Sequence, residues 1–298
     1  MPSFNPHAFT QGPRLPSRLE PTGSVLVSID GTRAGQHALE WATAEASARG
    51  GALSIVRPVA SPSVAAGQWL LASQPGFAEM AYSVGREDLA AAREQAHAID
   101  PQLAVSTDLL PGALGPALLR SRTTDALVVV GRPRGMGQVW APELSAAWGV
   151  LNRGQGSIAL VDLTDVCHAG PSTGRVVLAL DAARHPSTVI AAAFRAALRR
   201  CARITFLHVW GDGAVSQAME EALATCRTVF PDVEVRTRAV RSLTRAVMDE
   251  SHGAALTVVA APESARDVVG RARALRLVRA ARGPVTVVSP ARPQKGVG

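Results

Sequence analysis

The most constraining feature of this 298-residue sequence is an internal repeat. An apolar run that ends on an aspartate opens each copy, as Val-Leu-Val-Ser-Ile-Asp at residues 25–30 and as Val-Val-Leu-Ala-Leu-Asp at 176–181. A helical pattern, a second apolar strand and a second helix follow each run. Self-similarity at a spacing of about 150 residues indicates two copies of one domain rather than one large domain.

Composition places the boundaries between these copies. A proline-rich, polar stretch at residues 1–22 is typical of a flexible tail, and a Gly-Pro-Ser-Thr-Gly segment ends at residue 174. We therefore expect a first domain at 23–163, a linker at 164–173, a second domain at 174–290 and a short tail at 291–298.

Hydrophobic periodicity predicts the elements of both copies. In the first copy we expect strands near 24–30, 53–59, 103–109, 126–130 and 157–161, with helices near 33–49, 84–99, 114–121 and 145–153. In the second copy we expect strands near 175–181, 204–210, 233–238, 256–260 and 285–288, with helices near 186–200, 215–230, 243–252 and 271–281.

Strands that alternate with helices predict βαβ units with right-handed crossovers. The strands are continuously apolar, as parallel strands are when helices cover both faces of the sheet. The predicted fold class is therefore α/β, with two tandem, doubly wound, five-stranded parallel-sheet domains. Ligands bind such sheets beyond the carboxyl ends of the strands, where Asp30 and the loop that begins at Gly131 both lie.

Composition and motifs exclude several classes of protein. No apolar run is long enough to cross a membrane, and the N-terminus lacks the pattern of a signal peptide. Three cysteines without motif spacing favour a reduced, cytoplasmic protein, and we assign no metal site. The sequence has no Gly-x-Ser-x-Gly elbow, no HExxH, no Walker A motif and no GxGxxG, so we assign no catalytic residue.

The positive net charge of +7 does not predict nucleic-acid binding. Residues 174–290 carry 17 arginines and 10 acidic residues, but the arginines are scattered over several elements. No aromatic residues are interleaved with them for base stacking.

Several segments together resemble the universal stress protein family in its tandem, actinobacterial-like form. They are the Ile-Asp-Gly-Thr turn at 29–32, the Leu-His-Val-Trp strand end at 207–210, the Gly-x-x-x-Pro segment at 112–116, and the strand, glycine loop, helix and strand of 126–161. The resemblance covers about 24–162 and 174–289. It implies a fold similar to the adenine nucleotide alpha hydrolases and a stress-response binding protein rather than an enzyme.

ATP-binding members of this family carry Gly-x2-Gly-x9-Gly-Ser/Thr after the fourth strand, where backbone N–H groups face the phosphates. The resemblance implies a nucleotide site in the first copy, with ATP as its ligand. Its residues would be Asp30, Gly131, Arg132, Arg134, Gly135, Gly137 and Ser145.

This loop departs from the family pattern. Arg134 and Leu144 stand where the family has glycines. Arg132 and Arg134 add positive charge for phosphate, or else the side chains of Arg134 and Leu144 fill its space. Pro58 lies near a position where the family offers a backbone N–H to the base, and proline has none.

In the second copy, Asp181 remains but the glycine loop does not, so we expect no nucleotide there. The alternatives are an interaction scaffold that has lost nucleotide binding and an ATP-pyrophosphatase-like enzyme on the same fold. The enzyme would need a Ser-Gly-Gly-x-Asp-Ser-like loop after the first strand, and Asp-Gly-Thr-Arg stands there instead.

The last strand of each copy, 158–161 and 285–288, is short, apolar and at the sheet edge by topology. An exposed edge of this composition recruits other strands. We therefore expect the two strands to pair within the chain, with a homodimer as the alternative; protein partners are not indicated.

Overall fold

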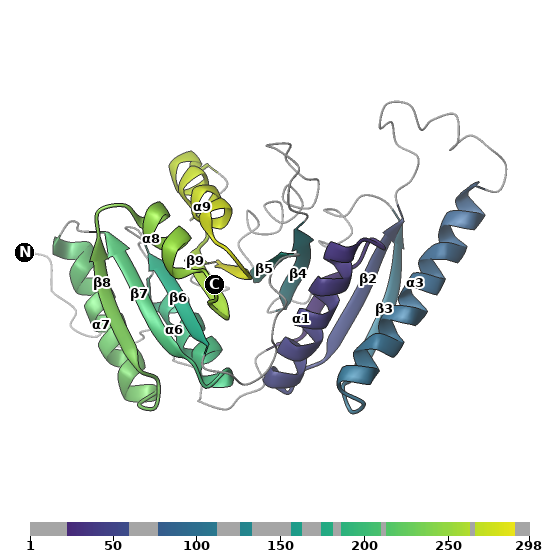
Figure 1. The fold of residues 1–298 in the computed structure, drawn as a ribbon, viewed down its shortest axis with the longest axis horizontal. Coiled ribbons are helices and arrows are strands. Elements are labelled where there is room, and N and C mark those ends of the chain that lie inside the picture. Colours follow the sequence, from purple (N-terminus) through teal and green to yellow (C-terminus); the bar gives the residue numbers. More distant parts are fainter. Residues whose placement is uncertain are drawn as a thin grey trace, which may run out of the picture.

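The computed structural model describes residues 23–59, 77–111, 126–132, 156–162, 174–180, 186–209, 213–262 and 266–289. The helices expected near 114–121 and 145–153, most of the glycine loop and the linker lie outside these residues. Figure 1 shows the two copies as the two halves of one continuous sheet.

The first copy contains β1 (Val25–Ser28), α1 (Arg33–Arg49), β2 (Leu53–Val59), α3 (Phe77–Ile99), β3 (Val105–Pro111), β4 (Leu127–Arg132) and β5 (Ser157–Asp162). The second copy contains β6 (Arg175–Leu180), α6 (Pro186–Arg199), β7 (Arg203–Val209), α7 (Gly213–Val229), β8 (Val235–Val240), α8 (Leu243–Glu250), β9 (Leu256–Ala260), α9 (Val268–Ala280) and β10 (Val285–Val288).

The strands form a ten-stranded sheet in the order β3-β2-β1-β4-β5-β10-β9-β6-β7-β8. Each half is parallel, and β1 lies between β2 and β4, with Ser28 level with Val56 and Val130. This order is that of a doubly wound sheet. The predicted α/β fold class is confirmed.

The two halves are joined by an antiparallel pair between β5 and β10, with Leu160 opposite Val285 and Ile158 opposite Val287. The pairing expected of the two final strands is therefore present within the chain. All four side chains are buried. The pair removes two apolar edges that would otherwise be open to other chains.

Two apolar cores cover the faces of the sheet, and both extend across the β5–β10 junction. One contains residues of α1, α3, α6 and α7, with Phe194 among its largest fully buried side chains. The other contains residues of α8 and α9. Because each core includes residues from both copies, the copies share their hydrophobic layers.

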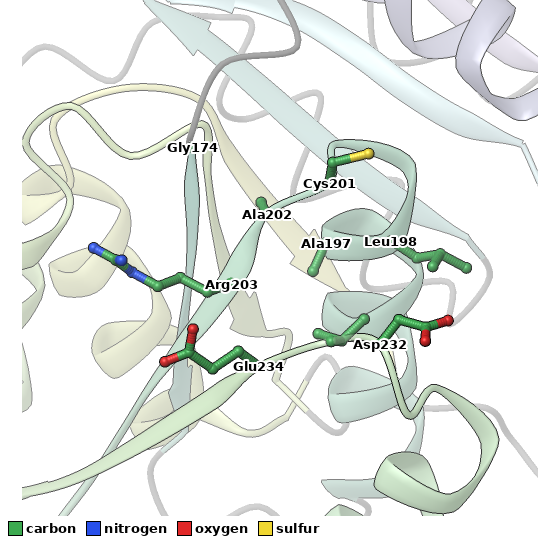
Figure 2. Close-up of a pocket in the computed structure, with 9 residues that line it drawn as sticks. Gly174, Ala197, Leu198, Cys201, Ala202, Arg203, Asp232 and Glu234 are labelled. Carbon is green, nitrogen blue, oxygen red and sulfur yellow. The ribbon is translucent and has the colours of Figure 1, made fainter.

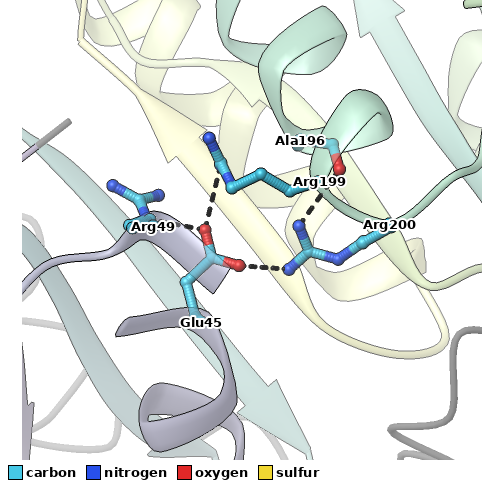
Figure 3. A network of polar contacts seen from close by, with 5 residues as sticks. All are labelled: Glu45, Arg49, Ala196, Arg199 and Arg200. Carbon is cyan, nitrogen blue, oxygen red and sulfur yellow. Dashed lines mark hydrogen bonds and ion pairs between the residues drawn. The ribbon is translucent and has the colours of Figure 1, made fainter. Parts of the chain in front are cut away.

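A buried carboxylate links the two copies where α1 and α6 lie close together (Figure 3). Glu45 of α1 accepts from Arg199 Nη2 at 3.0 Å and from Arg200 Nη2 at 2.5 Å, both from α6. It also accepts from Arg49 Nε of its own helix at 2.7 Å. The Arg200 guanidinium lies over the ring of Trp41, 5.6 Å from its centroid. Periodicity alone gives no reason to expect a buried charge in α1.

Three helices begin earlier than the periodicity predicts, among them α7, which begins at Gly213 rather than near 215. Helix α3 begins at Phe77 rather than near 84, and it carries Gly85 within its length. A Cβ at Gly85 would lie 2.6 Å from Leu109 Cδ1, so the glycine permits close packing on β3 rather than ending the helix. Helix α9 begins at Val268 rather than 271, because Asp267 caps it.

Two strands are displaced by two residues along the chain. Strand β3 spans Val105–Pro111 rather than 103–109, and β8 spans Val235–Val240 rather than 233–238. Both are the outermost strands of the sheet and have one neighbouring strand within the part that the structure describes. An edge strand with one polar side offers a weak periodicity, which leaves its ends poorly determined by sequence.

Candidate functional site

The candidate site lies at the carboxyl ends of β1 and β4, the position at which ligands bind in doubly wound sheets. Asp30 follows β1, and Gly131 is the penultimate residue of β4. The two strands are neighbours, so the topology brings the predicted carboxylate and the start of the predicted glycine loop to one edge.

Both residues approach the first turn of α1. A Cβ on Gly35 would lie 2.7 Å from Asp30 Oδ1. A Cβ on Gly131 would lie 2.4 Å from the carbonyl oxygen of Ala34 and 2.9 Å from Gly35 N. No larger residue fits at Gly131 without displacing α1, so this glycine allows β4 to pass directly beneath the helix N-terminus.

The Asp30 carboxylate also organises the turn into α1. Its Oδ1 accepts from Thr32 N at 2.9 Å and from Thr32 Oγ1 at 2.6 Å. Thr32 caps the helix, and its Oγ1 accepts from Gly35 N at 3.2 Å. Gly31 has a φ of +78°, which this Asx turn requires. Asp30 is exposed. The hydrogen bonds from Thr32 hold its carboxylate in a defined position at the surface of the site.

An ion pair that the sequence analysis missed lies beside this turn. Arg57 Nε of β2 donates to Asp88 Oδ2 of α3 at 2.9 Å, and both side chains are partly buried. A Cβ on Gly31 would lie 3.5 Å from Asp88 Oδ2 and 3.9 Å from Arg57 Nη2. A charged residue near the end of an apolar strand was the available signal for Arg57. Asp88 lies 31 residues away in the sequence, and no local pattern there predicts that it pairs with Arg57.

Pro58 lies in β2 opposite Leu110 of β3. Its carbonyl accepts from Arg57 Nη1 at 3.3 Å, and it has no N–H to offer a ligand. The Arg57 guanidinium is a hydrogen-bond donor that β2 brings to this part of the site.

Arg132 contacts the second copy. Its Nη1 donates to the Val278 carbonyl at 2.7 Å and its Nη2 to the Ala281 carbonyl at 3.4 Å, both at the C-terminal end of α9. Such carbonyls carry partial negative charge and favour a cation. The phosphate-binding role of Arg132 stays a prediction. Four other predicted residues, Arg134, Gly135, Gly137 and Ser145, lie outside the described residues.

In the second copy, the helix that follows β9 is α9, the counterpart of the helix expected near 145–153 in the first copy, and a carboxylate caps it. Asp267 Oδ1 accepts from Gly270 N at 2.8 Å. A Cβ on Gly270 would lie 2.1 Å from Asp267 Oδ2, so the carboxylate is seated directly on the first turn. A helix N-terminus is where a phosphate would bind, and a negative side chain already occupies it. Asp181 and residues 263–265 lie outside the described residues.

A cavity of about 490 Å³ lies elsewhere, at the amino ends of the second-copy strands (Figure 2). Leu198 and Cys201 of the α6 end, Arg203, Asp232 and Glu234 are among the residues that line it. It lies at the opposite edge of the sheet from the carboxyl strand ends, so it is not the counterpart of the Asp30 site.

Among the described residues, no group of His, Cys, Asp and Glu is arranged to hold a metal ion. Nor does any described helix have the length and apolarity needed to cross a membrane.

No protein-family model matches the sequence. Universal stress proteins from two strains of Mycobacterium tuberculosis are each 28% identical to it over 257 residues, which cover 79% of this chain and 85% of the relative.

Solved structures show the same fold. A universal stress protein from Archaeoglobus fulgidus superposes with a TM-score of 0.69 at 13% identity, over 91% of this chain and 97% of that one. A putative universal stress protein from Pseudomonas aeruginosa gives a TM-score of 0.54 at 15% identity, over 90% and 93%. Sequence and fold together show that this chain is a tandem relative of the universal stress proteins.

Proposed function

We propose that this chain is a stress-response protein that binds one adenine nucleotide, ATP, in its first copy and acts by binding rather than by catalysis. The names of its relatives support the stress-response role. One observation in the second copy supports the stoichiometry. Asp267 caps α9 there, so a negative side chain already occupies the helix N-terminus that follows β9. In the first copy, Asp30 and Gly131 meet at the carboxyl ends of β1 and β4.

In this proposal each described residue has a separate task. Asp30 would hold the ribose hydroxyls, since an exposed carboxylate fixed by Thr32 is a good acceptor. Gly131 would let the phosphate loop leave β4 close to α1. The ion pair of Arg57 and Asp88 would border the nucleoside end, where Pro58 offers no N–H.

Titration calorimetry with ATP tests the proposal. We expect about one ATP per chain, and we expect Asp30→Ala to abolish binding because the positioned carboxylate is lost. Asp181→Ala, at the matching strand end of the second copy, is the matched control and should bind as the unmodified protein does. Circular dichroism shows whether Asp30→Ala still folds. Two equivalent sites would refute the proposed stoichiometry.

An interaction scaffold is the second candidate, and one contact favours it. The Arg132 guanidinium is engaged by carbonyls of α9, so it acts in joining the two copies. Absence of binding at millimolar ATP would support the scaffold. Release of AMP and pyrophosphate from ATP, followed by chromatography, would instead support an enzyme.

A further inference from the structure

A cluster of arginines surrounds Glu45 where α1 meets α6. Arg49, Arg199 and Arg200 all form ion pairs with this single carboxylate (Figure 3). Their side chains are 14%, 15% and 17% exposed, so the cluster is shielded from solvent but reachable from it. One carboxylate therefore faces three guanidinium groups at the contact between the two copies.

Arg195 adds a fourth guanidinium. It lies one turn before Arg199 on α6, and residues four apart share a helix face. It forms no hydrogen bond or ion pair with any residue that the structure describes, and it is partly buried. Burial, followed by the neighbouring charge of Arg49, lowers the pKa of Arg195. This guanidinium is therefore held near other cations without a described counterion.

Arg199 pairs with Glu45 through Nη2, but another of its donor atoms is unused. Its Nε is buried and has no hydrogen-bond partner among the described residues. Burial and the charges of Arg49 and Arg200 together lower the pKa of Arg199 to about 10. The negative charge of Glu45 opposes this shift. Helix carbonyls offset a part of the charge, since Arg200 Nη1 donates to the Ala196 carbonyl at 3.3 Å. Within the part of the chain that the structure describes, the Arg195 guanidinium and Arg199 Nε therefore have no hydrogen-bond acceptor.

We propose that the surface between α1 and α6 binds a phosphate-type oxyanion, held by Arg195 and Arg199 beside Arg49. Planar guanidinium groups match the geometry of such oxyanions and bind them through paired hydrogen bonds. The anion is either free inorganic phosphate or the phosphate group of a larger molecule. Because α1 and α6 belong to different copies, binding would stabilise the contact between them.

This site is separate from the proposed nucleotide site. Helix α1 runs from Arg33, beside Asp30, to Arg49 at its far end, and 17 residues at about 1.5 Å each span about 25 Å. The oxyanion site therefore lies at the opposite edge of the sheet. Loss of one site should not abolish the other.

Thermal unfolding and calorimetry with inorganic phosphate test the proposal on the full chain. In buffer without phosphate, added phosphate should raise the melting temperature more than sodium chloride of equal ionic strength. Arg195→Gln should weaken phosphate binding about tenfold, the loss expected for one charge-assisted hydrogen bond. Since Arg195 has no described partner, this variant should keep its fold.

Two controls separate this site from other effects. Arg227→Gln removes an exposed arginine from α7 and should leave phosphate affinity unchanged. Asp30→Ala should also leave it unchanged even where it abolishes ATP binding, so failures of the two proposals are distinguishable. The proposal is overturned if phosphate acts no more strongly than chloride, if Arg195→Gln binds like the unmodified protein, or if Arg227→Gln weakens binding equally.

A further titration identifies the source of the anion. If AMP binds with the same sensitivity to Arg195→Gln as inorganic phosphate, the site accepts the phosphate group of a larger molecule. If only inorganic phosphate binds, the free ion is the ligand. Either result supports an oxyanion site.

Discussion

Replacing Glu45 with glutamine should be among the most destabilising single polar substitutions in this chain. The side chain is 2% exposed and is the shared acceptor of Arg49, Arg199 and Arg200. Glutamine keeps the shape and removes the negative charge. Three partly buried guanidinium groups then repel one another across the contact between the two copies.

The size of the effect follows from the pKa of Glu45. Burial by itself raises this pKa, but Arg200, Arg49 and Arg199 outweigh burial and lower it from 4.5 to about 2. At about 1.4 kcal/mol per pKa unit, the ionised form gains about 3 kcal/mol of stability on folding. Removing one partner of a buried ion pair costs about 3–5 kcal/mol in other proteins, which agrees with this figure.

The sign of the pH dependence follows from the direction of the change. A carboxylate whose pKa is lowered by folding contributes its full stability above the unfolded value of 4.5 and loses it as the pH falls towards about 2. The free energy of unfolding of the Glu45→Gln variant should therefore lie about 3 kcal/mol below that of the unmodified protein at neutral pH. This difference should shrink between pH 4.5 and pH 2.

Urea unfolding followed by tryptophan fluorescence measures this difference at each pH. Trp41 lies against Arg200 and reports on the same contact. Glu40→Gln, at an exposed position of the same helix, is the matched control and should change stability little. A difference below about 1 kcal/mol at neutral pH, or one that stays constant down to pH 2.5, would refute this account of the cluster.

Three further predictions address the backbone, the junction and the predicted loop. Cys201 has a φ of +47°, so Cys201→Gly should raise the free energy of unfolding by about 1 kcal/mol in urea titrations; an unchanged or lower value would show that this conformation is not strained. Leu160→Asp would place a charge in the buried β5–β10 pair, opposite Val285, and should lower the melting temperature and enlarge the hydrodynamic radius; if both stay as before, the pair does not hold the copies together. Arg134→Gly should strengthen ATP binding in calorimetry if this side chain fills the phosphate space, whereas weaker binding would show that it supplies charge.

Local patterns in the sequence determined the class of fold and the general place of the site. The apolar runs that end on aspartate predicted parallel strands, and alternation with helices predicted a doubly wound sheet. Once that topology was assumed, the closeness of Asp30 and Gly131 followed, because β1 and β4 must be neighbours. The apolar character of 158–161 and 285–288 likewise pointed to the junction between β5 and β10.

Only the tertiary structure decided which polar groups meet. Glu45 is an ordinary glutamate by sequence, and it is buried because α6 places Arg199 and Arg200 beside it from 154 and 155 residues away. Arg132 reaches α9 across 146 residues, although the sequence assigned it to phosphate.

The physical reason is that hydrophobic periodicity is set by residues close together in the sequence, whereas a polar contact joins residues that are far apart in it. Periodicity reports which side of an element is apolar, and this depends on neighbouring residues. A hydrogen bond between distant polar side chains depends on how whole layers pack, and neither partner carries a local mark of the other.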